Sequence, residues 1–340
     1  MALPKGTALR KGRYRIQRLL ARGGFGFIYL ALDRLSGRQV VLKELIPTLM
    51  NDVDSLRRFI REGRTMQRLR HPNIARTEAM FKENDNHYIV IEYVSGGALS
   101  DRTDRGHKLN LSEAMMVALS LCNALAYLHE QGITHCDLQP GNVLFDAAGH
   151  CKLVDLGIAH VSNGFVHRAW QTERDLAIGT VFFMSPEQLD GVRDDPRVDL
   201  YALGALLYLM LAGRHYLDFD LRNTAGAQAD NVNRVRRQVP VPIPDVPAEV
   251  NPVLLRALAK QPDARYPDIG SFRRDLVQAV LAYLPPESKM HLVLSSSRSN
   301  DSSTFLRVRI DEWPRWIWMA LLAINLATML LAALLLLTLP

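Results

Sequence analysis

Cysteine is scarce in this chain, and its spacing excludes several classes of protein. The 340 residues hold three cysteines, Cys122, Cys136 and Cys151, with no Cys-x-x-Cys pair and no histidine cluster at metal-ligand spacing. Three cysteines are too few for a disulfide scaffold, so we expect reduced thiols in a cytosolic protein. The first 13 residues also lack the apolar core of a secretory signal.

The sequence also lacks the features of a nucleic-acid-binding protein. Its net charge of +6 favours acidic partners, but it contains no stripe of basic and aromatic residues and no finger spacing. A domain that binds phosphates near anionic lipid is commonly basic too. We expect no nucleic-acid partner, since that function would require a strongly salt-dependent affinity. With 48% apolar and 22% charged residues, the composition predicts a packed core.

Residues 14–93 have the pattern of short strands with one helix. Apolar, β-prone runs at Gly26–Leu30, Arg38–Leu42 and Tyr88–Ile91 predict three of the strands. The segment Val53–Leu69 places apolar residues among arginines at helical spacing, which predicts an amphipathic helix.

After Gly97 the pattern becomes helical. Apolar side chains recur at helical spacing at Ala118, Leu121, Leu125 and Leu128. Ser112 is the predicted N-cap of this helix, and Gly132 is predicted to end it. Three further helices are predicted at about Val198–Ala212, Pro252–Lys260 and Ile269–Leu284.

The composition changes after this helical part. Residues 285–315 form a predicted juxtamembrane linker. Its serines are crowded at Ser295, Ser296, Ser297, Ser299, Ser302 and Ser303. A flexible linker is the favoured interpretation, and a set of phosphorylation targets is the alternative.

Residues 316–339 are 24 residues without a charge. As a helix they span about 36 Å, enough for a hydrocarbon core of about 30 Å. Tryptophans stand at the leading edge and arginines precede them, at Trp313, Trp316, Trp318, Arg307, Arg309 and Arg315. We predict one transmembrane helix that anchors the chain, with its N-terminal side in the cytoplasm. The alternative, a buried core helix, would need a domain around it.

Small residues gather in the run Ala21–Gly26, where they let backbone N–H groups approach phosphate oxygens. A β-prone run follows, whereas a dinucleotide-binding turn would open a helix. We therefore predict a glycine-rich hairpin over the phosphates of a nucleotide. The predicted contacts are Ala21, Gly23, Gly24 and Gly26.

Lys43 lies on the predicted strand after this hairpin, between apolar residues, and needs a partner. Glu62 on the following predicted helix is the candidate. A lone Lys–Glu pair is more often structural, but the upstream glycines favour a nucleotide site.

Two later segments, His135–Asn142 and Asp155–Gly157, carry carboxylates and an amide. Oxygen ligands of this kind suit Mg²⁺, and one aspartate remains to act as a base.

Taken together, these motifs resemble the eukaryotic-like serine/threonine protein kinases, particularly the bacterial ones. The resemblance covers about Tyr14 to Leu284. It extends to the segments His71–Ile74, Gly179–Thr180, Ser185–Glu187, Asp199–Gly204 and Arg265. It implies an α+β, two-lobed protein kinase fold, with a strand-rich lobe at about 14–94 and a helical lobe at about 95–284 after an extension at 1–13.

The resemblance also implies a role for each matching residue, with ATP and Mg²⁺ as cofactors. Lys43 would hold the α- and β-phosphates and pair with Glu62. Asp137 would accept the proton of the substrate hydroxyl. Asn142 and Asp155 would bind Mg²⁺.

Further roles concern the hinge and the support of the helical lobe. The backbone of Glu92 to Val94 would hydrogen-bond adenine, with Ile91 beside it. Glu187 would pair with Arg265, and Asp199 would hold the catalytic loop.

Four residues depart from the family pattern. Ala21 replaces the first glycine of the loop and Leu156 replaces a phenylalanine, and both changes are mild. Gln139 replaces a lysine that neutralises the transferring phosphoryl group, so turnover could fall. Cys136 replaces an arginine that reaches a phosphorylated activation segment. We therefore expect activity to depend little on phosphorylation there, with control by a partner or by clustering in the membrane.

These observations predict a membrane-anchored protein kinase that transfers the γ-phosphoryl group of ATP to serine or threonine hydroxyls of protein substrates. The preference for serine and threonine rests on Thr180 and on the resemblance. The predicted catalytic residues are Asp137, Lys43 and Gln139. The alternative is a pseudokinase scaffold that binds nucleotide and partners without transfer, which Gln139 favours.

Overall fold

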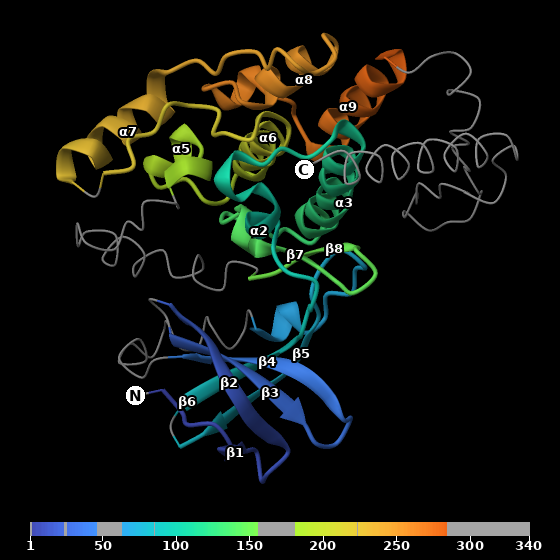
Figure 1. Ribbon diagram of the computed structural model, residues 1–340, viewed down its shortest axis with the longest axis vertical. Coiled ribbons are helices and arrows are strands. Elements are labelled where there is room, and N and C mark those ends of the chain that lie inside the picture. The colour runs from blue at the N-terminus through green and yellow to red at the C-terminus, as the bar shows by residue number, and fades with distance from the viewer. Residues whose placement is uncertain are drawn as a thin grey trace, which may run out of the picture. The chain divides into compact units, whose positions relative to one another are not determined.

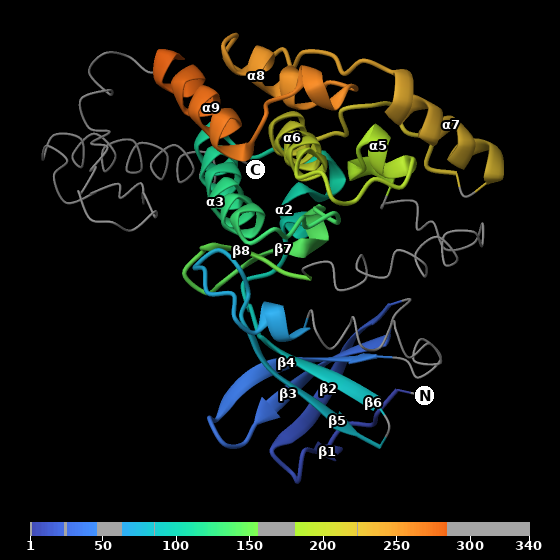
Figure 2. The same cartoon turned by 180° about the vertical axis from the view of Figure 1, so that it is seen from behind.

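Strands fill the first part of the chain and helices the second, as the periodicity predicts (Figure 1). The computed structural model describes residues 2–23, 26–45, 63–84, 86–155, 181–222 and 224–283. Figure 2 shows the same arrangement from behind. The predicted two-lobed α+β architecture is confirmed for this part of the chain.

The N-terminal lobe is an antiparallel sheet with the strand order β1-β2-β3-β4-β6-β5. Its strands are β1 (Ala8–Leu9), β2 (Tyr14–Gly23), β3 (Gly26–Asp33), β4 (Arg38–Leu45), β5 (Thr77–Glu83) and β6 (Asn86–Glu92). Alternate residues of β2 point to opposite faces, so Tyr14 and Ile16 are buried while Arg15 is exposed. The three strands predicted from sequence are all present.

The C-terminal lobe is built mainly from helices. These are α2 (Leu99–Thr103), α3 (Leu111–Glu130), α5 (Pro186–Leu189), α6 (Arg197–Ala212), α7 (Ala225–Arg237), α8 (Val250–Ala257) and α9 (Ile269–Tyr283). Short 3₁₀ turns lie at Asp104–Gly106, Pro140–Asn142, Val181–Phe183 and Pro262–Ala264. Helix α6 is buried on nearly every side and forms the centre of the core, with α3, α8 and α9 packed around it.

Helix α3 begins two residues earlier than its predicted cap requires. Asn110, not Ser112, is the N-cap: its side chain accepts a hydrogen bond from the backbone N–H of Glu113 at 2.9 Å. The Glu113 carboxylate in turn accepts from the N–H of Asn110 at 3.1 Å. Gly132 follows the helix with a φ of 69°, as a residue ending a helix often does.

Helix α3 is also, among the described residues, the one helix long and apolar enough to cross a membrane. Its inward residues, including Leu121, Cys122 and Leu125, are fully buried in the lobe's core. The helix therefore has the character of a core helix of a folded domain.

Helix α8 spans Val250–Ala257, about two residues earlier than predicted, because its buried residues Val250, Val253 and Leu254 begin before the proline-based estimate. The predictions for α6 and α9 are confirmed to within one residue.

A two-stranded hairpin, β7 (Val143–Phe145) and β8 (Cys151–Leu153), lies between the sheet and the helices (Figure 1). Ile74, before β5, forms a parallel bridge with Leu153, and Ala98 forms an antiparallel bridge with Leu144. These backbone contacts place the end of β7 beside the segment that links the lobes.

Several predictions fall outside the described residues. They concern Gly24, Glu62, residues 156–180 and most of the helix at Val53–Leu69, of which residues 63–66 are described and are helical. The predicted linker at 285–315 and transmembrane helix at 316–339 lie outside as well. The three cysteines are free and buried, and burial raises the pKa of the Cys122 and Cys151 thiols to about 12.

Candidate active site

The backbone of the loop between α3 and β7 is held by one buried carboxylate. Asp199, fully buried at the start of α6, accepts hydrogen bonds from the backbone N–H groups of His135 and Cys136, both at 2.8 Å. Oδ2 of Asp199, which accepts from His135, also lies 2.8 Å from Nε2 of His129 on α3. Cys136 has a φ of 63°, a conformation that L-residues rarely adopt. The hydrogen bonds to Asp199 therefore maintain a strained turn just before Asp137.

The carboxylate of Asp137 is oriented by two amides from the same loop. Gln139 Nε2 donates to both carboxylate oxygens, at 3.1 and 3.2 Å. Asn142 Nδ2 donates to the backbone oxygen of Asp137 at 2.8 Å and to Oδ2 at 3.0 Å. Gln139 thus stands beside the predicted base, where it supplies a hydrogen bond without a positive charge.

Burial raises the pKa of Asp137, and the nearby carboxylate of Asp155 adds to the increase. Hydrogen bonds from Asn142 and Gln139 oppose it, as does His135. The hydrogen bonds that Asn142 and Gln139 donate to the ionised Asp137 carboxylate therefore offset part of the cost of burying it.

Asn142 and Asp155 are brought together by a backbone contact between their segments. The N–H of Val154 donates to the backbone oxygen of Asn142 at 2.9 Å. Asp155 comes next, with a φ of 58°, and its carboxylate contacts the ammonium of Lys43 on β4. A carboxylate and an amide oxygen are ligands that suit a hard divalent cation, so this donor set fits Mg²⁺.

The predicted hairpin at the glycine-rich run is present. Gly23 at the end of β2 pairs with Gly26 at the start of β3, and Gly26 has a φ of 152°. Strand β4 follows in register, so that Lys43 lies opposite Ile28 of β3. The lysine therefore lies on the strand next to the hairpin.

One face of the sheet near Lys43 carries apolar side chains that are only half-buried. Val41 is two residues from Lys43 and lies opposite Ile91 of β6, so both share the face of Ile28 and Lys43. Leu144 of β7 is half-buried too. Such a surface suits the flat, apolar ring of a nucleotide base, and sequence reasoning gave no role to Ile28 or Leu144.

The segment predicted to be the hinge follows β6. Glu92 donates its backbone N–H to Arg76 at 2.8 Å, and its carboxylate forms an ion pair with Lys152 of β8 at 2.8 Å. Val94 is buried. The side chain of Glu92 therefore ties the sheet to the β7–β8 hairpin.

The predicted pair that braces the helical lobe is also formed. Arg265 is 2% exposed and binds Glu187 in bidentate fashion, at 2.5 and 2.8 Å. Its guanidinium also donates to the backbone oxygens of Ala259, Lys260 and Arg197. All of its donors are engaged, which satisfies a buried cation.

Sequence reasoning missed Glu44, the residue after Lys43. It is 4% exposed, and its carboxylate accepts hydrogen bonds from Tyr29 Oη at 2.7 Å, Tyr88 Oη at 2.9 Å and Asn86 Nδ2 at 2.7 Å. Because successive side chains of β4 point to opposite faces, Glu44 lies on the face opposite Lys43. This alternation was the sequence signal that could have identified Glu44. This network anchors the strand that carries the lysine.

Comparison with known proteins places this geometry in a family. The model of the protein kinase domain matches residues 14–274. The serine/threonine-protein kinase PrkC of Bacillus subtilis is 34% identical over 273 residues, which cover 79% of this chain and 40% of PrkC. PknA of Mycobacterium tuberculosis is 33% identical over 284 residues, which cover 82% of this chain and 64% of PknA.

Solved structures show the same fold. A mutant form of the Mycobacterium tuberculosis PknI kinase domain superimposes with a TM-score of 0.61 at 26% identity, covering 82% of this chain and 99% of that one. The described fold is thus that of a protein kinase domain. The chain belongs to the protein kinase family, within the eukaryotic-like serine/threonine kinases of bacteria. It spans only 40 to 64% of the length of the curated relatives named above.

Proposed function

We propose that this protein is a serine/threonine protein kinase that transfers the γ-phosphoryl group of ATP to hydroxyl groups of protein substrates. The observation that carries the proposal is the convergence of Lys43, Asp137, Asn142 and Asp155 from separate parts of the chain. The named relatives, PrkC and PknA, are described as serine/threonine-protein kinases, which supports the same activity.

The roles of the residues follow from their positions. Lys43 and the backbone of the hairpin would bind phosphates, and the half-buried face of Ile28, Val41 and Ile91 would take the adenine beside the hinge of Glu92 and Val94. Asn142 and Asp155 would hold Mg²⁺, which neutralises phosphate charge when bound. Asp137 would orient the substrate hydroxyl and accept its proton.

Gln139 favours a second candidate, the pseudokinase scaffold. It donates to Asp137 where the family pattern has a lysine, so the site has one positive charge fewer near the phosphoryl group. The amide preserves the orientation of Asp137, and for this reason we favour a slow kinase over an inactive one.

Incubation of the purified chain with labelled ATP, Mg²⁺ and a generic protein substrate tests the proposal. We expect Mg²⁺-dependent labelling of serine and threonine, abolished in Asp155→Asn and nearly so in Lys43→Met. Nucleotide binding without transfer by the unsubstituted protein would instead establish the scaffold.

We further propose that residues 316–339 anchor the chain in a membrane, with the kinase domain in the cytoplasm and self-association in the membrane plane. The support is the uncharged run of 24 residues with tryptophans and arginines before it. The full chain should remain with membranes during alkaline carbonate extraction, whereas a chain ending near Ser288 should be released. Full-length protein that is soluble and monomeric without detergent would contradict the anchor.

A further inference from the structure

The sheet lobe carries far more positive charge than the rest of the chain. Residues 1–92 hold 18 lysines and arginines and nine aspartates and glutamates, a net charge of +9, although the whole chain has only +6. The remainder is therefore net negative. A field of one sign on one lobe attracts and orients anionic partners.

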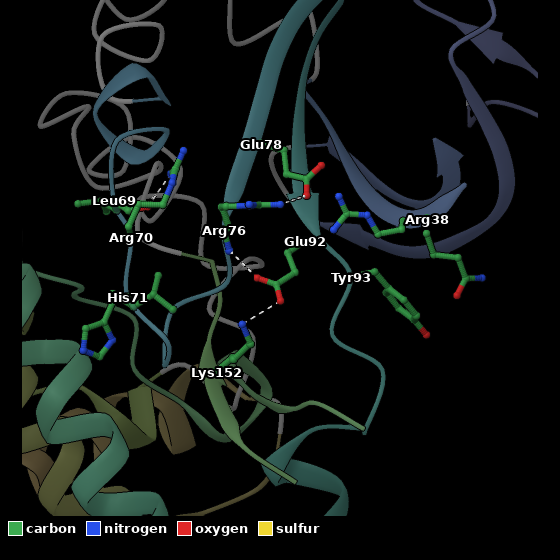
Figure 3. Close-up of a pocket in the computed structure, with 11 residues that line it drawn as sticks. Arg38, Leu69, Arg70, His71, Arg76, Glu78, Glu92, Tyr93 and Lys152 are labelled. Carbon is green, nitrogen blue, oxygen red and sulfur yellow. Dashed lines mark hydrogen bonds and ion pairs between the residues drawn. The ribbon is translucent and has the colours of Figure 1, made fainter. Parts of the chain in front are cut away.

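Part of this charge lines a concave surface behind the hinge, which we call the hinge groove. It has a volume of about 450 Å³ and contains four cationic and two acidic side chains. These are Arg38, Arg70, Arg76, Lys152, Glu78 and Glu92. Figure 3 shows Arg38, Arg76, Glu78 and Glu92 of the sheet lobe and Lys152 of β8 pointing toward one another, whereas Arg70 lies at the edge of the groove with its guanidinium turned away from them. Lys43, Asp137, Asn142 and Asp155 do not line the groove, so it is separate from the catalytic residues.

Two of the four cations in the groove are already paired with acids. Arg76 binds Glu78 at 2.7 Å, and Lys152 binds Glu92 at 2.8 Å (Figure 3). Both pairs are partly exposed, so they fix side-chain positions more than they add stability.

The other two cations are not neutralised. Arg70 is exposed, and among the described residues its guanidinium donates to the backbone oxygens of Gln67 and Leu69, at 2.7 and 2.8 Å. Arg38 is also exposed, and within the described part of the chain no carboxylate pairs with either arginine. The arginines, lysine and glutamates of the groove thus sum to a net charge of +2, and burial lowers the pKa of His71, which disfavours a further positive charge.

A second hollow of about 470 Å³ continues the basic surface. It shares Arg70, Arg76 and Glu78 with the hinge groove and adds Arg10 and Arg13. The two hollows therefore adjoin along the back of the sheet lobe. A long concave surface fits an extended chain better than it fits a flat bilayer.

The lining of the hinge groove also includes apolar residues. Leu69 and Ile74 are buried beneath it, and Tyr93 forms part of its wall. A hollow of this size that combines cationic side chains with the ring of Tyr93 matches a peptide that carries acidic residues beside an apolar one, and it exceeds what a small inorganic anion requires.

We propose that the hinge groove binds an acidic peptide segment of a protein substrate and so docks that substrate away from the catalytic cleft. The docking role rests on the proposed kinase activity, but peptide binding does not. Binding measured without nucleotide therefore separates failure of the groove from failure of the enzyme.

The probe is a fluorescent ten-residue peptide with four glutamates and one leucine, titrated with the full chain in detergent. A peptide with glutamine in place of glutamate is the uncharged control, and one with phosphoserine distinguishes phosphate from carboxylate recognition. We expect salt-sensitive binding of the glutamate or phosphoserine peptide, and at least about tenfold weaker binding of the glutamine peptide.

The variant Arg38→Glu should weaken binding of the anionic peptide at least about fivefold, and Arg38→Glu combined with Arg70→Glu should abolish it. Arg34→Glu makes the same charge change at an exposed turn residue outside both hollows and is the matched control. It should bind as the unsubstituted protein does. If the double variant does not fold, the single variant at the exposed Arg38 still decides the question.

The same variants predict a split in kinetics. Arg38→Glu should raise KM for an acidic protein substrate while kcat for a short neutral peptide stays unchanged. Equal binding of charged and uncharged peptides, or equal loss in Arg34→Glu, would overturn the proposal. So would sedimentation showing a dimer that dissociates in Arg38→Glu and excludes the peptide, because a second copy would then occupy the groove.

Discussion

Replacing Asp199 by asparagine should weaken the domain and its catalysis together. The carboxylate accepts hydrogen bonds from the N–H groups of His135 and Cys136 and contacts Nε2 of His129, all at 2.8 Å, with no exposure to water. Asparagine keeps one oxygen but turns an NH₂ group toward a buried donor. At about 1.5–3 kcal/mol for a hydrogen bond to a charged group, the expected loss is about 2–4 kcal/mol.

Losing the hydrogen bonds of Asp199 should also change the position of the catalytic residue Asp137. The turn at Cys136 has a φ of 63°, and strain of this kind costs about 1–2 kcal/mol that the Asp199 contacts offset. Without them the backbone before Asp137 is expected to relax and displace its carboxylate. We therefore expect kcat to fall at least about tenfold, with a smaller change in KM for ATP.

Urea unfolding followed by circular dichroism, with steady-state transfer assays, measures both effects. Asp190→Asn is the matched control, because Asp190 is an exposed carboxylate that pairs with Arg236 at 2.6 Å. That variant should lose less than about 1 kcal/mol. An Asp199→Asn protein that is as stable as the control, with unchanged kcat, would show that the loop is held by other contacts.

Three more predictions concern other parts of the domain. Gln139→Lys should raise turnover, because it restores a positive charge beside Asp137; a clear loss with unchanged ATP binding would show that the amide has a positive role. The pKa of Asp33 is lowered to about 2 by its hydrogen bonds with Arg13, so its contribution to stability is present above about pH 4 and is lost toward pH 2. Asp33→Asn should therefore cost about 1–2 kcal/mol at pH 7, since Arg13 is one-third exposed, and about half as much at pH 3, in urea unfolding at both values; an equal cost at both would refute this. Thr172→Ala and Ser162→Ala, assayed after phosphatase treatment, should each retain most activity, and silencing by either would contradict the argument from Cys136.

Local patterns were sufficient to predict much of the sheet lobe. The strand at Arg38–Leu42 and the pairing of Gly23 with Gly26 depend on residues close in sequence, whose alternation and small size restrict the backbone directly. The N-cap of α3 could also have been predicted, since Asn110 and Glu113 have capping-box spacing, although the prediction placed the cap at Ser112.

Some residues of the candidate site could be predicted from local motifs, and others could not. The order and spacing of Asp137, Asn142 and Asp155 were visible in the sequence, and so was the uncharged run at 316–339. The roles of Glu187, Arg265 and Asp199 came from family resemblance, because partners 63 to 78 residues apart leave no local pattern.

The tertiary structure alone decided which groups share a surface. It placed Glu44 among two tyrosines and an asparagine, and it brought Arg38, Arg70, Arg76 and Lys152 to one groove. Sequence periodicity says which face of a strand a residue occupies, but the neighbours across that face are set by how the strands and lobes pack. Local residue types therefore determined the elements and motifs of this protein, whereas chain packing determined its buried polar networks and its basic groove.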